Sequence, residues 1–305
     1  LKKNSVACFV VASIGVIVPL IGGTACYYFY FEPGQTSYDS VLKAVFIGVV
    51  LTATSVSITV EALREMGKLD GKVGNAILGA AVIDDIMGII VLTVVISLKD
   101  ESVSIVGILL KILLYAALMI MIAYICKSFK GIIDANKGKR RITTYVVAAC
   151  FIVAFASEEY FGIADITGAY LLGLFLSQHE IKHEIAKKVS SPSYLFFSPI
   201  FFASVGLKVS LDGFSSELLT FSLILLVVAI LTKIIGCGLG ARVCGFNTAE
   251  AIQVGVGMIS RGEVALIVAQ KGYDIGLIDA DMFPPIVIVV IATTVITPII
   301  LKKIM

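Results

Sequence analysis

The most constraining feature of this sequence is a succession of apolar segments, each close to the roughly 20 residues that a helix needs to cross a lipid bilayer. Of the 305 residues, 58% are hydrophobic and only 15% are charged, whereas soluble domains carry about a quarter charged residues. A chain with so little polar surface cannot cover a water-facing globule. We therefore predict an all-α membrane protein with about ten transmembrane helices, over residues 5–31, 41–64, 73–98, 103–127, 142–158, 162–178, 192–208, 217–244, 248–271 and 281–303.

Lysine and arginine gather at alternate ends of these predicted helices. One set of ends holds most of them, including the basic loop 127–141, whereas the other set holds many acids, such as Asp100, Glu101 and Asp279. Because Lys and Arg in short loops favour the cytoplasmic side, we predict a multi-pass protein of the cell membrane with both ends of this chain in the cytoplasm. The chain opens on Leu1 and not on Met, so we expect it to be a fragment whose N-terminal helices are absent.

Three predicted helices carry charge near the middle of the membrane. Asp84 and Asp85 lie about 17 Å from the inner end of the third helix, and Lys233 lies about 14 Å from the inner end of the eighth, at 1.5 Å per residue. The ninth contains Arg261 and Glu263. Ionisable residues inside the bilayer are energetically unfavourable and usually functional.

An ion pair between Asp84 and Lys233 that only holds two helices together is the structural alternative. It leaves the second carboxylate unexplained, because neighbouring residues point about 100° apart on a helix. An unpaired acid in a wet cavity can bind a proton or a cation, so we favour a transport site in which Asp84 pairs with Lys233 and Asp85 holds the ion.

Two predicted helices contain residues that favour an interruption. Thr52, Thr54 and Ser55 belong to a run of hydroxyl residues in the second helix, and the stretch 255–262 crowds glycines into the ninth. Glycine tolerates unusual dihedrals, and hydroxyls can satisfy freed backbone groups. Close helix packing through small residues is the alternative. A matched pair of interrupted helices is the sequence pointer to a secondary-transporter site and to an inverted repeat.

At these residues the sequence resembles the monovalent cation:proton antiporter-2 family, and within it the NapA-type sodium/proton antiporters. The matching stretches begin at Leu51, Ile77, Phe201, Leu231 and Met258, and they keep the family's order along the chain. The adjacent aspartates are the most diagnostic part. Potassium-selective members tend to lack the first one, and this chain has both.

The resemblance implies sodium (or lithium) exchange for protons by alternating access at Asp84, Asp85 and Lys233, with more protons entering than sodium leaving. Asp85 would bind sodium transiently, while Asp84 would alternate between Lys233 and a proton. A Kef-type potassium/proton antiporter is the alternative, and a passive cation channel is a weaker one. The interrupted helices would cross beside the site, with Glu61, Arg261 and Glu263 forming internal ion pairs that support them.

The resemblance also implies a division of the chain and its partners. Residues 1–98 and 211–305 would form the core bundle, 99–130 a linker helix, and 131–210 part of a dimerisation bundle. The partners would be the lipid bilayer and, in the full-length protein, a second copy of the chain. We expect no nucleic acid and no cofactor, only the transported ions H⁺ and Na⁺, with Li⁺ or K⁺ as further candidates.

Two enzyme readings are disfavoured. His179 and His183 match the H-E-x-x-H zinc-protease signature, but the sequence contains no third histidine to complete a site, and the segment is basic. Ile181, Ile185 and Val189 instead give it a stripe suited to the membrane surface, and pH sensing by the histidines is a further reading. An intramembrane aspartyl protease needs aspartates on facing helices, whereas these two are adjacent. We therefore predict neither zinc binding nor enzymatic activity.

Overall fold

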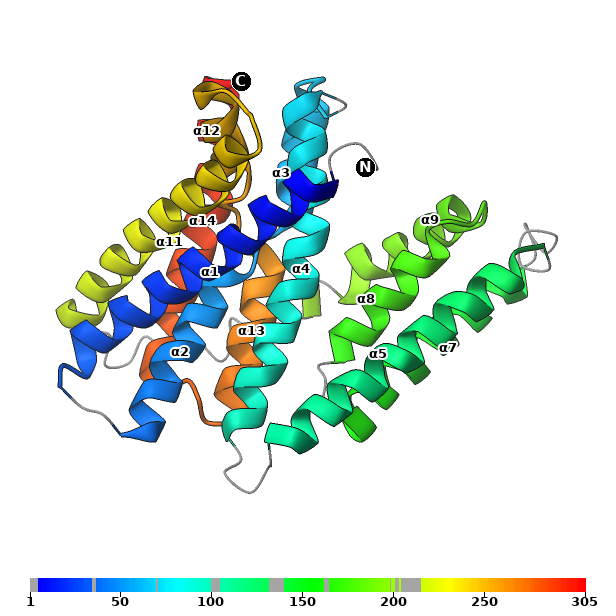
Figure 1. Ribbon diagram of the computed structural model, residues 1–305, viewed down its shortest axis with the longest axis horizontal. Coiled ribbons are helices and arrows are strands. Elements are labelled where there is room, and N and C mark those ends of the chain that lie inside the picture. The colour runs from blue at the N-terminus through cyan, green and yellow to red at the C-terminus, as the bar shows by residue number, and fades with distance from the viewer. Residues whose placement is uncertain are drawn as a thin grey trace. The chain divides into compact units, whose positions relative to one another are not determined.

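The computed structural model describes residues 5–34, 37–69, 71–99, 105–131, 140–161, 165–197, 199–200, 203 and 215–305. Every regular element in these ranges is helical (Figure 1). The chain divides into two compact units, one formed by Leu1–Lys99 with Lys208–Met305 and the other by Asp100–Leu207. An all-α fold is therefore confirmed for the part of the chain that the structure describes.

The first unit is built from two series of helices that are far apart in sequence. The N-terminal series is α1 (Ser5–Phe31), α2 (Tyr38–Thr52), α3 (Val56–Glu65) and α4 (Lys72–Lys99). The C-terminal series is α11 (Ser216–Val243), α12 (Thr248–Gly257), α13 (Gly262–Asp274), the 3₁₀ turn η2 (Ala280–Met282) and α14 (Phe283–Ile304). In each series a long helix precedes two short ones and a second long helix follows them.

Local sequence fixes where several of these helices begin. Ser37 precedes α2, and its hydroxyl accepts a hydrogen bond from the Ser40 N–H. Asn247 and Glu250 form a capping box at the start of α12, and Ser215 caps α11 through the Leu218 N–H. Each side chain satisfies a backbone donor that the first helical turn leaves without a partner.

Helix α1 packs along α11 (Figure 1). Glycines allow this close approach: a Cβ added to Gly240 would lie 2.7 Å from the Val11 Cα, and one added to Gly236 would lie 2.9 Å from the Ile14 carbonyl oxygen. Helix α1 also packs on α2 and α4, while α11 packs on α12 and α14. The two long helices therefore form the centre of this unit.

The apolar surface of α11 faces away from this centre. Seven residues at a spacing of four form an exposed stripe, each of them 47–75% exposed: Leu219, Leu223, Val227, Leu231, Ile235, Leu239 and Val243. The buried face of the same helix carries Lys233 instead. Because most of the other buried residues of α11 are apolar or glycine as well, the helix is apolar on both faces, unlike a surface helix of a soluble protein, and this is what a lipid-facing helix requires.

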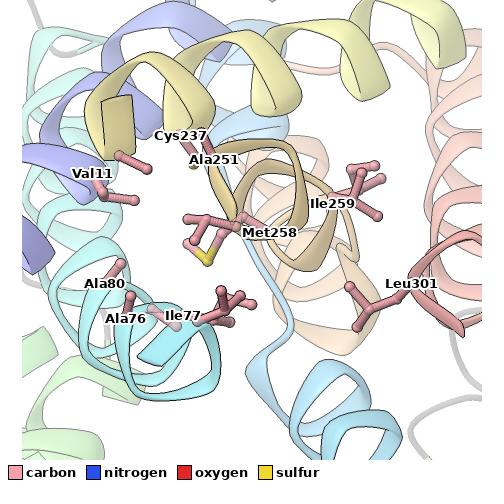
Figure 2. Close-up of a cluster of buried hydrophobic side chains, with 14 of the residues drawn as sticks. Val11, Ala76, Ile77, Ala80, Cys237, Ala251, Met258, Ile259 and Leu301 are labelled. Carbon is pink, nitrogen blue, oxygen red and sulfur yellow. The ribbon is translucent and has the colours of Figure 1, made fainter. Parts of the chain in front are cut away.

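An apolar cluster fills the space between α4, α11 and the interruption after α12. Figure 2 shows Met258 near the middle of the cluster, with Ala76, Ile77 and Ala80 of α4 below it and Cys237 above it. Met258 and Ile259 are both fully buried. The cluster fixes the interrupted segment against the helix that carries the two aspartates.

Ion pairs tie the helix ends of the first unit together. Lys43 on α2 pairs with Asp279, which precedes η2, at 2.9 Å, and Lys99 pairs with Asp39 at 2.8 Å. At the starts of α4 and α12, Lys72 pairs with Glu250 at 2.6 Å. The ends of α3 and α14 are joined by Glu65 and Lys302 at 3.1 Å. Partly exposed pairs of this kind contribute little stability individually.

The second unit contains α5 (Ile105–Ser128), α7 (Arg140–Phe161), α8 (Asp165–Leu176), α9 (Lys182–Pro192) and the π-helical turn η1 (Ser193–Phe197). Helix α8 packs on α5 and α7. Tyr115 and Met119 of α5 form the small core of this unit with residues such as Val153 and Phe175, and the Ser157 hydroxyl donates to the Tyr115 hydroxyl at 3.2 Å.

The helices follow most of the predicted bounds, with one difference in the second unit. The predicted helix 192–208 lies mostly outside the described residues, and its first residues continue a helix that already begins at Lys182. Because residues 182–188 are rich in lysine, the sequence did not indicate that they continue into the apolar segment after Pro192. Five described helices are long and apolar enough to cross a membrane, and the pair α12 and α13, bent by 52°, gives a sixth.

The close contact of α1 with α11 can be tested with two neighbouring glycines. Gly240→Ala is expected to destabilise the protein by about 1–3 kcal/mol, because the new methyl group forces the two backbones apart. Gly238→Ala is the matched control, since its Cβ would meet nothing closer than 3.4 Å. Thermal unfolding of the purified protein in detergent measures both, and equal stability of the two variants would contradict the packing.

Candidate ion-binding site

Two charges of opposite sign meet in the interior of the first unit. The Lys233 Nζ of α11 donates to both carboxylate oxygens of Asp84 of α4, at 3.0 and 3.2 Å. Lys233 is 0% exposed and Asp84 is 1% exposed. The pairing predicted from their similar depth is therefore present in the structure.

A glycine on α1 makes room for this pair. A Cβ added to Gly15 would collide with the Cys237 Sγ and lie 3.9 Å from Asp84 Oδ1. Cys237 lies one helical turn after Lys233 and is fully buried. The lysine and the cysteine thus share a face of α11, which α1 covers through its glycine.

Asp85 lies beside the pair in a different environment. It is half-buried, and no hydrogen bond or ion pair joins its carboxylate to any residue that the structure describes. The charged groups that act on it are Asp84, Lys233 and Glu263. Adjacent positions on one helix therefore hold one paired, fully buried carboxylate and one that water or an ion can approach.

The two interruptions lie against each other. Helix α2 ends at Thr52 and α3 begins at Val56, while α12 ends at Gly257 and α13 begins at Gly262. The Ser55 N–H donates to the Ser260 carbonyl at 2.7 Å, and the Thr59 hydroxyl donates to the Gly257 carbonyl at 2.7 Å. Each interruption thus satisfies backbone groups that the other one exposes.

Gly262 is required where the interruptions touch. Its φ is +55°, and a Cβ there would collide with the Ser55 side chain. The Ser55 hydroxyl donates to Glu263 Oε2 at 3.2 Å, so a hydrogen bond between side chains reinforces the backbone contact. A larger residue at Gly262 would separate the two segments.

Thr52 and Thr54 turn their hydroxyls onto the backbone of their own segment. Thr52 donates to the Val49 carbonyl at 2.7 Å, and Thr54 donates to the Thr52 carbonyl at 3.4 Å. The Thr52 oxygen lies 3.8 Å from where a Gly88 Cβ would be. Because Gly88 is one turn after Asp84, the interruption after α2 faces the aspartate-bearing side of α4.

Arg261 supports the interruptions differently from the predicted ion pair. Its side chain is fully buried, and its guanidinium donates to the carbonyls of Leu51 and Ala53 at the end of α2 and to the Ala229 carbonyl of α11, the last at 2.7 Å. It forms no ion pair with the described residues. The last carbonyls of a helix carry partial negative charge, so the end of α2 takes the place of a carboxylate. The Glu61 side chain lies outside the described residues.

The two histidines do not lie on a common helical face. His179 is buried in the turns between α8 and α9, whereas His183 is an exposed residue in the first turn of α9. Among the described residues, no group of three or more His, Cys, Asp or Glu side chains is arranged to hold a metal ion.

Sequence reasoning missed three contributors to this region: Gly15, Cys237 and the Ala229 carbonyl. Cys237 was detectable in principle, because its spacing of four from Lys233 places both on one helical face. Gly15 and Ala229 act through contacts with other helices. Their spacing in the sequence therefore carries no signal.

The buried pair can be tested by a double-mutant cycle. Lys233→Gln is expected to destabilise the protein by about 3–5 kcal/mol, because it leaves the Asp84 carboxylate without its partner. Combining it with Asp84→Asn should restore much of that stability, since neither variant side chain is charged. Thermal unfolding of the parent, both single variants and the double variant measures the coupling. Strictly additive losses would contradict the pairing.

Arg261 is expected to matter more for stability than its single charge suggests. Arg261→Gln leaves carbonyls at the end of α2 without a donor, and each unsatisfied buried group costs about 1–3 kcal/mol. Arg261→Lys should recover only part of that loss, because one ammonium group cannot span the α2 and α11 acceptors. Unfolding midpoints and folded yield measure these effects. Parent-like stability of Arg261→Gln would exclude this role.

The sequence was compared with known proteins. It matches the family described as the transmembrane sodium/hydrogen exchanger over residues 1–305. It is 40% identical to the Na⁺/H⁺-K⁺ antiporter GerN of Bacillus cereus, covering 99% of this chain and 76% of that protein.

Two further relatives carry similar names. The chain is 36% identical to a Na⁺/H⁺ antiporter of Enterococcus hirae over 94% of its length and 76% of that protein. It is 31% identical to the high-affinity Na⁺/H⁺ antiporter NhaS3 of Synechocystis over 95% of its length and 63% of that protein. These matches confirm the resemblance stated from the motifs, and the chain belongs to the sodium/hydrogen exchanger family.

Proposed function

We propose that this protein is a secondary active transporter of the cell membrane that exchanges sodium or lithium for protons. The observation that carries the proposal is the pair of unequal carboxylates: Asp84 held by Lys233, and Asp85 half-buried with no partner among the described residues. The printed activities of the relatives, all of them Na⁺/H⁺ antiporters, support the same reaction.

In the proposed cycle, Asp85 binds the cation and Asp84 exchanges its lysine for a proton. A sodium ion needs oxygen ligands and a compensating negative charge, and the accessible carboxylate supplies both. When Asp84 takes a proton, Lys233 loses its counter-charge and must release a proton or move. Coupling between these groups follows because neither charge is stable alone in a low-dielectric interior.

The supporting residues hold the backbone around the ion path. Thr52, Thr54 and Ser55 lie at the interruption after α2. Arg261 donates hydrogen bonds to the carbonyls at the end of α2. Glu263 binds Ser55 and adds negative charge near Asp85. We assign Glu61 to the same supporting group on its sequence position.

The architecture that we propose is an inverted repeat of about ten helices. The support for it is the matched order of α1–α4 and α11–α14, together with the two interruptions that satisfy each other's backbone groups. We assign the first unit to the core bundle, and the second to the linker helix and part of a dimerisation bundle. The full-length protein would then be a homodimer, with both ends of this chain in the cytoplasm.

Potassium is a second candidate cargo, because the printed name of the GerN antiporter includes K⁺. A passive channel is the competing class of function. Selectivity filters usually arrange ligands in rings around a pore, whereas this site is asymmetric and contains a charge-paired acid, which favours coupled exchange.

Transport in sealed vesicles that contain the full-length protein tests the proposal. Adding sodium or lithium should dissipate a preset pH gradient, and Asp85→Asn should abolish that response because the ion loses its charged ligand. Potassium added in the same way tests the second cargo. If sodium and lithium leave the gradient intact, or if Asp85→Asn behaves like the parent, the proposal fails.

Asp84→Asn is expected to have a different effect from Asp85→Asn. It removes the proton-exchanging partner of Lys233 but leaves the ion ligand, so some exchange should persist with less charge moved per cycle. The two variants are distinguished by measuring how strongly the sodium-driven pH change depends on the membrane potential. Equal and complete loss of transport in both would contradict the division of roles.

A further inference from the structure

A basic cavity lies at one end of the second unit, whereas Asp84 and Asp85 belong to the first unit. It has a volume of about 190 Å³ and is lined by Ala123, Lys127, Lys130, Phe175, Gln178 and His179. This is several times the roughly 30 Å³ that one water occupies in the liquid. Ala123 and Lys127 lie near the end of α5 and Phe175 lies near the end of α8, while the other three lining residues follow these helices. The cavity therefore lies where two separate helices end.

The charged wall of the cavity has one sign. Lys127 is in the last turn of α5, and Lys130 comes two residues after this helix ends at Ser128. Their ammonium groups repel each other, and none of the described residues that line the cavity is acidic. The nearest acid in sequence, Glu180, adjoins the lining residue His179. An anion would relieve this repulsion.

The other walls suit an amphiphilic anion. Gln178 contributes amide donors, and His179 is only 3% exposed, so the lining includes a buried imidazole as well as flexible surface side chains. Ala123 and Phe175 supply apolar surface. Beside them, Tyr124 on α5 is 71% exposed, and Phe129, which follows the end of α5, is 50% exposed. Polar donors and apolar surface therefore adjoin each other, as at a membrane interface.

The proposed orientation places the end of α5 in the cytoplasm, where lysines have simpler explanations, and these do not account for the whole arrangement. The positive-inside rule and the helix dipole both favour basic residues near the end of α5. Neither requires them to line a cavity together with a buried histidine and the amide of Gln178, which follows α8. A basic pocket between transmembrane helices on the cytoplasmic side is the arrangement that binds anionic lipid headgroups.

We propose that this cavity binds a phosphate group, and that the anionic phospholipids of the cytoplasmic leaflet supply it. The phosphate oxygens would accept hydrogen bonds from Lys127, Lys130 and Gln178, while the glycerol and acyl carbons follow the apolar surface of α5 and α8. The lipid would thereby hold the ends of these two helices together. This site is independent of the exchange reaction proposed above.

A thermal-shift titration of the purified full-length protein in neutral detergent tests the site. The probes are dioctanoyl phosphatidylglycerol, dioctanoyl phosphatidylcholine and inorganic phosphate. Phosphatidylglycerol should raise the unfolding temperature saturably. Each basic residue near an anionic surface strengthens binding roughly fivefold, so Lys127→Gln combined with Lys130→Gln should weaken the apparent affinity about tenfold or more. Lys127→Arg combined with Lys130→Arg should retain it.

The matched control removes the same charge elsewhere. Lys187→Gln combined with Lys303→Gln changes two exposed lysines outside the cavity and should alter the affinity less than twofold. Equal weakening in both glutamine pairs would overturn the proposal, because only net charge would then matter. Equal affinity for phosphatidylcholine would also overturn it. If inorganic phosphate binds the parent and the lysine control variant but not the Lys127→Gln and Lys130→Gln variant, the phosphate site is supported. A soluble anion would then replace the lipid as the source of the phosphate.

The titration needs no transport, so its result is separate from that of the vesicle assay. Each variant is first compared with the parent without lipid, and the arginine pair provides a folded protein with the cavity charge preserved. Sodium-dependent exchange by the Lys127→Gln and Lys130→Gln protein should remain at the parent level in vesicles of phosphatidylcholine alone. Loss of lipid binding with exchange intact is the expected result.

Discussion

Backbone groups inside a bilayer must find partners within the protein, and this constraint shapes the first unit. Interrupting a helix in that environment exposes amides and carbonyls that water cannot satisfy. Here two interruptions lie side by side and satisfy each other, through the bonds from Ser55 to Ser260 and from Thr59 to Gly257. Neither interruption would be stable where it is without the other. The pair of interruptions is therefore one structural feature, although more than two hundred residues of sequence separate Ser55 from Ser260.

Arg261 extends this feature to the helix that carries the lysine. Its guanidinium joins the end of α2 to the Ala229 carbonyl, and Ala229 lies one turn before Lys233 on α11. The same residue thus offsets the partial charge of α2 and fixes the interruptions against α11. On the other side of Lys233, Gly15 and Cys237 allow α1 to lie close to the pair. The helix that carries Lys233 is thus contacted on both sides of this residue, and the ammonium group itself bonds to both carboxylate oxygens of Asp84.

Much of this arrangement follows from the sequence because the bilayer restricts what each residue can do. Apolar length predicts the long helices, and hydroxyls and glycines at mid-depth predict the interruptions near Thr54 and Ser260. The similar depths of Asp84 and Lys233 in the membrane predict their contact. The partner of Arg261 could not be predicted in this way. An arginine beside Glu263 suggests a carboxylate partner. The acceptors that it uses are backbone carbonyls, two of them free because α2 ends at Thr52 and the third that of Ala229 within α11. The stripe of Ile181, Ile185 and Val189 suggested a surface segment separate from the predicted membrane helix 192–208, whereas α9 and η1 run from Lys182 to Phe197 without a break.

The two aspartates differ in what their surroundings allow. A buried ion pair contributes little net stability, because the desolvation of both charges offsets their attraction. An apolar pair of similar size would hold α4 and α11 together as well as Asp84 and Lys233 do, so stability alone does not explain the charges. The proposed exchange, in which Asp84 replaces its lysine with a proton, accounts for them. Asp85, one residue away, has the opposite property: with no partner among the described residues, it can accept a cation without first breaking a contact. Placing both carboxylates on adjacent positions of one helix makes the charge state of each depend on the other, and that mutual dependence is what coupled exchange requires and passive permeation does not.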